Sequence, residues 1–161
     1  MAESIVGTFS FSSGNVAQNK FDSSNRRQAE WSQQEHKLQY NTATDATTVA
    51  AFTGTLGAIH YTGDVVEVSV TPITAPTGGD LEFTVDIRKS TGAGAFATIL
   101  SSVETVDNTS TTRTAQYATL SGTPTLARGD LLQLVIAVSG STGAQGIGVN
   151  VTIRYRENPT A

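Results

Sequence analysis

Residues 81–87 read LEFTVDI, residues 131–138 read LLQLVIAV, and residues 147–157 read IGVNVTIRYRE. Apolar side chains recur at every second position in all three, which is the period of a β-strand with one buried face. The side chains predicted to point inward, together with those of VVEVSV at 65–70, are Val66, Val68, Val70, Leu81, Phe83, Val85, Ile87, Leu132, Leu134, Ile136, Val138, Ile147, Val149, Val151, Ile153 and Tyr155.

Turn signals separate these strands at short intervals, as in Thr77-Gly78-Gly79-Asp80 and Arg128-Gly129-Asp130. Such spacing is typical of an antiparallel sandwich or barrel and not of alternating βαβ units. About eight strands can be counted when weak ones are included. The sequence therefore predicts an all-β protein, a jelly-roll-like antiparallel β-sandwich with an extended N-terminal arm. A seven-stranded immunoglobulin-like sandwich remains the alternative, because periodicity does not separate the two.

The chain changes composition near residue 50, which divides it into two predicted parts. Residues 48–161 form the sandwich domain, and residues 1–47 form an N-terminal strand followed by a polar arm. Alternation over 5–11 predicts the strand. Residues 12–47 have too few apolar side chains for a core of their own, and one short helix is expected around 27–37. An arm of this kind is ordered only by lying on something else.

The arm supplies the predicted partner-binding residues. Trp31, Leu38 and Tyr40 are its expected anchors, and Arg26 with Arg27 forms a basic spot suited to acidic groups on a partner. Phe9 and Phe11 lie in the N-terminal strand, which could pair with a neighbouring chain by strand addition.

Charge is low: 10 Lys and Arg stand against 14 Asp and Glu, a net charge of −4, and charged residues are 15% of the chain. This is below the roughly 25% of typical soluble domains. A weakly charged surface can lie against other subunits at small desolvation cost, whereas nonspecific nucleic-acid binding needs a basic patch. No apolar run approaches the roughly 20 residues of a membrane span, and no signal peptide is evident. We therefore expect neither a nucleic acid nor a membrane as partner.

No residue cluster predicts catalysis, a cofactor or a metal ion. Cysteine is absent, and His36 and His60 lack partners at metal-like spacing. Asp64, Asp80 and Asp130 each begin a strand, where a carboxylate satisfies backbone donors. The pair Glu82 and Asp86 is too widely spaced for most acid–base work. The tripeptide Arg128-Gly129-Asp130 matches an integrin-binding motif but is explained by turn geometry. The sequence thus predicts a protein that is not an enzyme.

Three stretches of the segment 64–156 resemble β-sandwich modules of tailed-bacteriophage virion proteins. They are DLEFTVDIRKSTGAGAFATIL at 80–100, ATLSGTPTLARGDLLQLVIAVSGS at 118–141, and the closing strand IGVNVTIRYRE. The resemblance implies a head decoration (cement) protein, a homotrimer bound to the major capsid protein on the capsid surface of the virion and made in the host cytoplasm. The alternative it implies is a tail-associated fibre or receptor-binding module that recognises a host surface glycan. No functional residue is carried over from either family.

Overall fold

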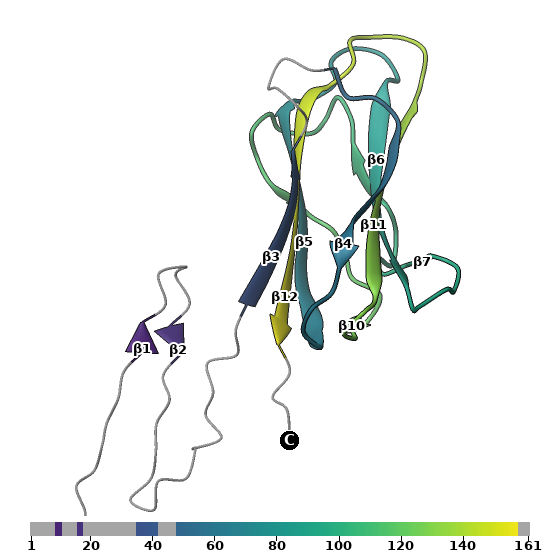
Figure 1. The fold of residues 1–161 in the computed structure, drawn as a ribbon. Helices are drawn as coiled ribbons and strands as arrows, with labels where there is room; N and C mark the ends of the chain where they lie inside the picture. Colours follow the sequence, from purple (N-terminus) through teal and green to yellow (C-terminus); the bar gives the residue numbers. More distant parts are fainter. Residues whose placement is uncertain (1–8, 11–15, 18–34, 42–47, 158–161) are drawn as a thin grey trace, which may run out of the picture.

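The computed structural model describes residues 9–10, 16–17, 35–41 and 48–157, and every regular element among them is a strand (Figure 1). In chain order the strands are β1 (Phe9–Ser10), β2 (Val16–Ala17), β3 (Glu35–Asn41), β4 (Phe52–Ala58), β5 (Gly63–Thr74), β6 (Glu82–Ser90), β7 (Ala97–Thr98), β8 (Glu104–Val106), β9 (Gln116–Tyr117), β10 (Thr125–Leu126), β11 (Leu131–Ser139) and β12 (Ile147–Glu157). β1 pairs with β2 antiparallel. The rest of the strand predicted over 5–11 lies outside the described residues.

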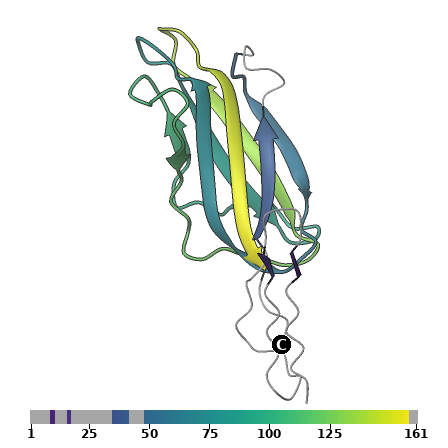
Figure 2. The same cartoon turned by 90° about the vertical axis from the view of Figure 1, so that its left-hand side faces the viewer.

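The remaining strands form two antiparallel sheets that face each other (Figures 1 and 2). One has the order β10-β5-β12-β3, with β9 also paired to β5, and the other has the order β4-β11-β6-β7, with β8 also paired to β6. β7 and β8 both pair with β6, and β9 and β10 both pair with β5, so each of these two pairs of short strands occupies one strand position in its sheet. The sandwich thus has eight strand positions.

The pairing pattern separates the two folds that the sequence left open. The first position pairs with the eighth (β3 with β12), the second with the seventh (β4 with β11), the third with the sixth and the fourth with the fifth. This is one long hairpin wound into two sheets, the jelly roll. An immunoglobulin-like sandwich would keep its first two strands in one sheet, whereas β3 and β4 lie in different sheets.

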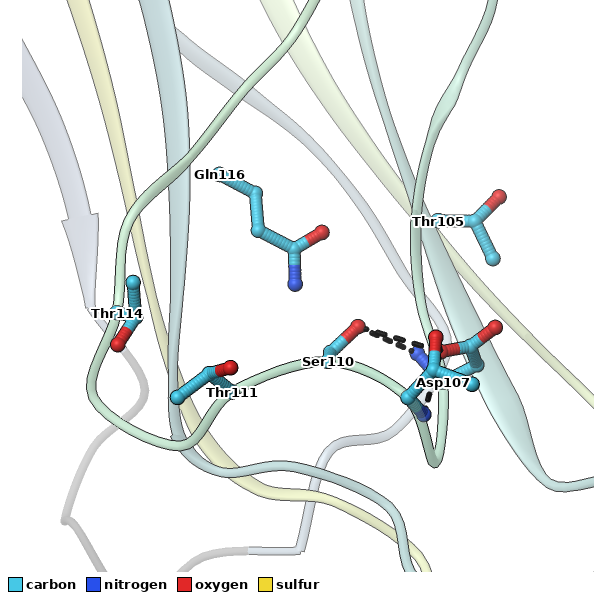
Figure 3. A pocket seen from close by; sticks show the side chains of 7 residues that line it. Thr105, Asp107, Ser110, Thr111, Thr114 and Gln116 are labelled. Atoms are coloured by element: carbon cyan, nitrogen blue, oxygen red, sulfur yellow. Dashed lines mark hydrogen bonds between the residues drawn. The ribbon is translucent and has the colours of Figure 1, made fainter.

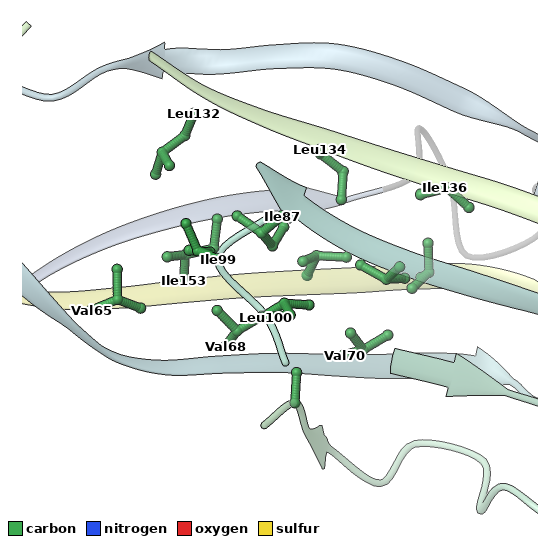
Figure 4. Close-up of a cluster of buried hydrophobic side chains, with 14 of the residues drawn as sticks. Val65, Val68, Val70, Ile87, Ile99, Leu100, Leu132, Leu134, Ile136 and Ile153 are labelled. Atoms are coloured by element: carbon green, nitrogen blue, oxygen red, sulfur yellow. The ribbon is translucent and has the colours of Figure 1, made fainter. Parts of the chain in front are cut away.

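The core lies between the two sheets and is built from the alternating side chains of the long strands (Figure 4). Phe83, Val85 and Ile87 of β6 are fully buried against β11, whose Leu132 and Leu134 are equally buried. Val149, Val151, Ile153 and Tyr155 of β12 are buried as predicted, while Leu81, Val138 and Ile147 are half-buried. At about 25 cal/mol per Å² of apolar surface, this core supplies most of the stabilisation.

The prediction for Val66 is wrong. Val65 is buried and pairs with Tyr155, while Glu67 pairs with Arg154, so the register shifts and Val66 is an extra residue in a β-bulge. A bulge reverses the side-chain alternation on one side of it. Val66 therefore faces outward and is 37% exposed.

The expected helix around 27–37 is also wrong where it can be checked, because Glu35–Lys37 belong to β3. Backbone pairing with β12 over seven positions satisfies the donors and acceptors that a helix would have used internally. The sandwich thereby includes a strand from the segment that the sequence assigned to the arm. Residues 27–34 lie outside the described residues.

The two long edges of the sandwich differ. At one edge, Leu100 and Leu120 bridge the two sheets, with Ser101 N donating to Thr119 O and Ser121 N to Ile99 O, both at 2.9 Å. At the other edge β3 and β4 end their respective sheets. Among the described residues, the second edge therefore has two long strands that each pair on one side only, and β3 begins there at Glu35.

Candidate functional site: the edge strand β3 and its surroundings

The structure brings together two of the seven predicted partner-binding residues. Leu38 and Tyr40 lie on β3, whereas Phe11, Arg26, Arg27 and Trp31 lie outside the described residues. Phe9 belongs to β1, and its side chain is not among those described. The candidate site is therefore β3 and its surroundings, where the N-terminal segment joins the sandwich.

The inner side of β3 is attached to the core. Leu38 and Tyr40 are half-buried and pack against the core cluster. The Tyr40 ring lies 4.9 Å from the Phe52 ring of β4, centroid to centroid, and so covers the gap between the two edge strands. Such an aromatic pair contributes about 0.5–1.5 kcal/mol beyond its buried area. Both residues thus anchor β3 within the chain itself.

A stack of three rings continues this inner side at the start of β3. His36 lies between Tyr61 and Tyr155, at centroid distances of 5.1 Å and 4.9 Å. Its Nε2 is 3.6 Å from Oε2 of Glu157 and has no hydrogen-bond partner among the described residues. Burial, with a smaller contribution from the nearby Glu157 carboxylate, raises the pKa of Tyr155. The stack fixes the point at which the N-terminal segment enters.

The outer side of β3 carries an ion-pair network that ties β3 to β12 and β5. These three strands lie side by side in one sheet (Figure 2). Arg154 of β12 donates from Nη2 to Glu35 of β3 at 2.7 Å and from Nη1 to Glu67 of β5 at 3.0 Å. Arg156 donates to the other oxygen of Glu35 at 3.0 Å. Hydrogen bonds from Arg154 first, and then Arg156, lower the pKa of Glu35, and the bond that Arg154 donates to Glu35 raises the pKa of Arg154.

The ion-pair network of Glu35, Glu67, Arg154 and Arg156 can hold β3 in place, but it does not present a group for catalysis. Each carboxylate of the network is paired with a guanidinium, so neither is placed as a general base. The described part of the chain has no group of three or more His, Asp or Glu residues that could hold a metal ion. It also has no helix long and apolar enough to cross a membrane.

Asp80 connects two loops at the end of the sandwich away from the start of β3. Its Oδ1 accepts hydrogen bonds from Ser141 N at 2.9 Å, Thr142 N at 2.7 Å and Thr142 Oγ1 at 2.7 Å. The bond from Ser141 N, followed by those from Thr142, lowers the pKa of Asp80 to about 2. The predicted role, a carboxylate that satisfies backbone donors, is confirmed.

The other two strand-entry aspartates are also engaged within the fold. Asp130 is only 3% exposed and accepts a hydrogen bond from Ala127 N at 2.9 Å, with Lys89 Nζ 3.6 Å away. A buried aspartate cannot reach a receptor, so the turn interpretation of the Arg-Gly-Asp tripeptide is confirmed. Asp64 accepts a bond from the hydroxyl of Thr125 at 2.7 Å.

The paired acidic residues Glu82 and Asp86 have separate partners. Asp86 is 6% exposed and is held by Arg88 Nε at 2.7 Å and the Thr98 hydroxyl, whereas Glu82 accepts a bond from Ser139 at 2.9 Å. They do not act as a pair.

Comparison with solved structures finds a likeness of fold to a chain of a phage capsid. A chain of the capsid of Ralstonia phage GP4 superposes with a TM-score of 0.53 at 17% identity, over 79% of this chain and 86% of that chain. A chain of the cyanophage Pam1 capsid asymmetric unit has a TM-score of 0.49 at 20% identity, over 78% and 84%. No family model and no curated protein matches the sequence. At 17% identity, the likeness to the Ralstonia phage chain shows the fold alone.

Sequence reasoning missed most of the residues around β3. Glu35 and Arg154 are far apart in the chain, and only the register of β3 against β12 brings them together. One signal was present: in EHKLQYN, His36, Leu38 and Tyr40 alternate with charged and polar residues.

Proposed function

We propose that this chain is a viral structural protein without enzymatic activity, a decoration (cement) protein on the outer surface of a phage head. The observation that carries the proposal is a jelly roll whose first strand, β3, follows 34 residues that include the predicted N-terminal strand and most of the predicted polar arm. The sandwich is the folded body, and the N-terminal segment reaches over neighbouring subunits and stabilises their contacts.

The anchoring of β3 supports this assignment. A segment that clamps a neighbour transmits force to its own domain, and β3 is tied in by its ladder with β12, by Tyr40 packed on Phe52, and by the ion pairs of Glu35. The low charge of the chain suits a surface that lies on other subunits. The partner is the major capsid protein, and the chain acts as a homotrimer on the virion, after synthesis in the host cytoplasm. Repeated copies on a lattice multiply weak contacts.

The test uses heads that lack this chain and the purified protein in three forms: full length, a variant without residues 2–34, and a full-length variant with residues 2–34 scrambled. The cut at 34 leaves β3 intact, so the truncated protein is expected to keep its fold. We expect only the natural full-length form to co-sediment with heads and to raise their resistance to heat.

Point variants sharpen this test. Trp31→Ala should weaken binding to heads, whereas Tyr117→Ala, which removes an aromatic ring that is 65% exposed on the sandwich, should not. The proposal fails if the full-length protein does not bind heads, if the truncated form binds equally well, or if imaging of particles places the chain on the tail. Tail location together with binding to host cells would favour the fibre module instead.

A further inference from the structure

A hollow of about 330 Å³ opens between β8 and β9, on the side of the sandwich away from β3 (Figure 3). Seven side chains line it, and each carries a hydroxyl, an amide or a carboxylate: Thr105, Asp107, Thr109, Ser110, Thr111, Thr114 and Gln116. The lining includes no cationic or aromatic side chain. Its volume falls within the range of about 300–1,000 Å³ of small-ligand sites.

Internal hydrogen bonds fix the shape of this hollow. Oδ1 of Asp107 accepts bonds from Thr109 N at 2.8 Å and Thr109 Oγ1 at 2.7 Å. In the amide orientation that its neighbours require, Gln116 donates to Thr105 O and to Glu104 Oε1, both at 3.1 Å, and accepts a bond from Ser110 Oγ at 2.9 Å. Figure 3 shows Gln116 and Ser110 pointing toward each other across the hollow.

The loop that carries these residues is also tied to the rest of the fold. Arg113 N donates to Pro72 O at 2.8 Å, and Ala75 N donates to the hydroxyl of Thr112 at 3.1 Å. Asn108 Nδ2 donates to Gly79 O at 3.0 Å. Arg113 has a φ of 58°, a left-handed conformation that is uncommon for a residue other than glycine. The hollow is therefore preformed, and a ligand entering it would not have to order the loop.

Three groups of the lining are unused within the described part of the chain, one of them the hydroxyl of Thr105. Oδ2 of Asp107 and the hydroxyl of Thr111 have no hydrogen-bond partner there, while Oδ1 of Asp107 is occupied. Hydrogen bonds from Thr109, its side chain first, lower the pKa of Asp107, so the carboxylate is an acceptor at neutral pH. Thr111 can both donate and accept.

This inventory narrows the class of ligand. An anion would find no cation, and an apolar molecule would find polar walls. A divalent cation would find a single carboxylate in the lining, too few anionic oxygens for tight binding. A sugar fits, because a sugar hydroxyl can donate a hydrogen bond to the carboxylate of Asp107 and accept one from the hydroxyl of a threonine. We propose that the hollow binds one or two residues of a neutral carbohydrate, wherever on a particle the chain is located.

The affinity of a single copy should be weak. With no aromatic ring in the lining and few available hydrogen bonds, a dissociation constant on the order of millimolar is expected. Several copies on one particle would raise the effective affinity without any new contact.

The test is a two-dimensional NMR titration of the ¹⁵N-labelled full chain with D-glucose, D-galactose, N-acetylglucosamine, maltose and lactose. At least one probe should give saturable shifts confined to the amides of residues 104–116. Thr111→Val keeps the shape of the side chain and breaks no internal hydrogen bond, and it should weaken binding roughly 3- to 10-fold, the loss of one neutral bond. Thr55→Val, at an exposed site on β4, is the matched control and should bind as the natural protein does.

A second variant checks the carboxylate. Asp107→Asn should weaken binding about tenfold or more, because it removes a charged acceptor. The proposal is overturned if no probe gives saturable shifts up to about 100 mM, if the shifts fall outside the hollow, or if Thr111→Val binds unchanged. It is also overturned if Ca²⁺ produces the same shifts and displaces the sugar. These outcomes do not depend on binding to heads, so they are separable from the proposed function.

Discussion

Replacing Gly143 by alanine should destabilise the fold far more than replacing Gly92. Gly143 has a φ of 107°, and a Cβ added there would lie 1.4 Å from Gly78 O. Gly92 has a φ of 59°, but a Cβ added there would meet nothing within 4 Å. The two positions share an unfavourable backbone conformation for alanine and differ in whether the methyl group has space.

The structure supports an estimate of the difference. At Gly143 the two loops must separate by about 2 Å to reach ordinary van der Waals contact, which breaks the paired bonds between Thr77 and Ala144, of 2.9 Å and 2.7 Å. Two lost backbone bonds cost about 2 kcal/mol together, and left-handed alanine costs about 1–2 kcal/mol. We expect Gly143→Ala to lose about 3–4 kcal/mol of unfolding free energy and Gly92→Ala only about 1–2 kcal/mol.

The unfolding free energy of both variants can be measured by urea denaturation followed by far-ultraviolet circular dichroism. With a slope of about 2 kcal/mol per M, the midpoint of Gly143→Ala should lie roughly 1 M below that of Gly92→Ala. Equal midpoints would refute the reasoning, because they would mean that the loops separate without loss or that their contact does not stabilise the fold.

Three further outcomes follow from contacts of single side chains. Because hydrogen bonds lower the pKa of Asp80 to about 2 from 3.8, its stabilising contribution is present above pH 4 and is lost as the pH falls toward 2; Asp80→Asn should therefore lose less stability over that window, as measured by urea midpoints at several pH values. Tyr40→Ala should lower the unfolding free energy by about 1–3 kcal/mol, and Gln39→Ala, on the outer side of the same strand, by less than about 0.5 kcal/mol, both from urea curves. Asp130→Ala should lose about 1–3 kcal/mol, because the bond that the partly buried N–H of Ala127 donates to the Asp130 carboxylate is lost, while cell adhesion to surfaces coated with the protein should be the same as for the natural chain.

The inward faces of the long strands were predictable because alternation is a local property. In β6, β11 and β12 every second residue is large and apolar, and one buried face requires just that pattern. The bulge at Val66 was not predictable, because it depends on how β5 pairs with β12 and leaves no mark on the run of valines. The choice between a jelly roll and an immunoglobulin-like sandwich was not predictable for the same reason, since it depends on which distant strands pair.

The edge strand shows a different limit. Four of the seven residues of β3 have charged or amide side chains, and its inner side has only Leu38, Tyr40 and a histidine, so its apolar signal is weak. Its stability comes from partners supplied by other strands, among them Phe52, Tyr155 and Arg154. The hollow between β8 and β9 was hidden for a related reason: a run of threonines and serines looks like any solvated loop until the fold places it around a cavity.

The pairing of Glu35 with Arg156 also has a mechanical consequence. Suppose that a force pulls on the start of β3 while the loops at the opposite end of the sandwich are held. The force then runs along the strand axis, and all the backbone hydrogen bonds between β3 and β12 are loaded together, in shear. The same pull opposed at the end of β12 would open those bonds one after another, as a zipper opens. The attachment of β3 is therefore strongest when a load applied at Glu35 is carried through the length of the sandwich. A force-spectroscopy experiment with the two attachment points would separate the two geometries by their rupture forces.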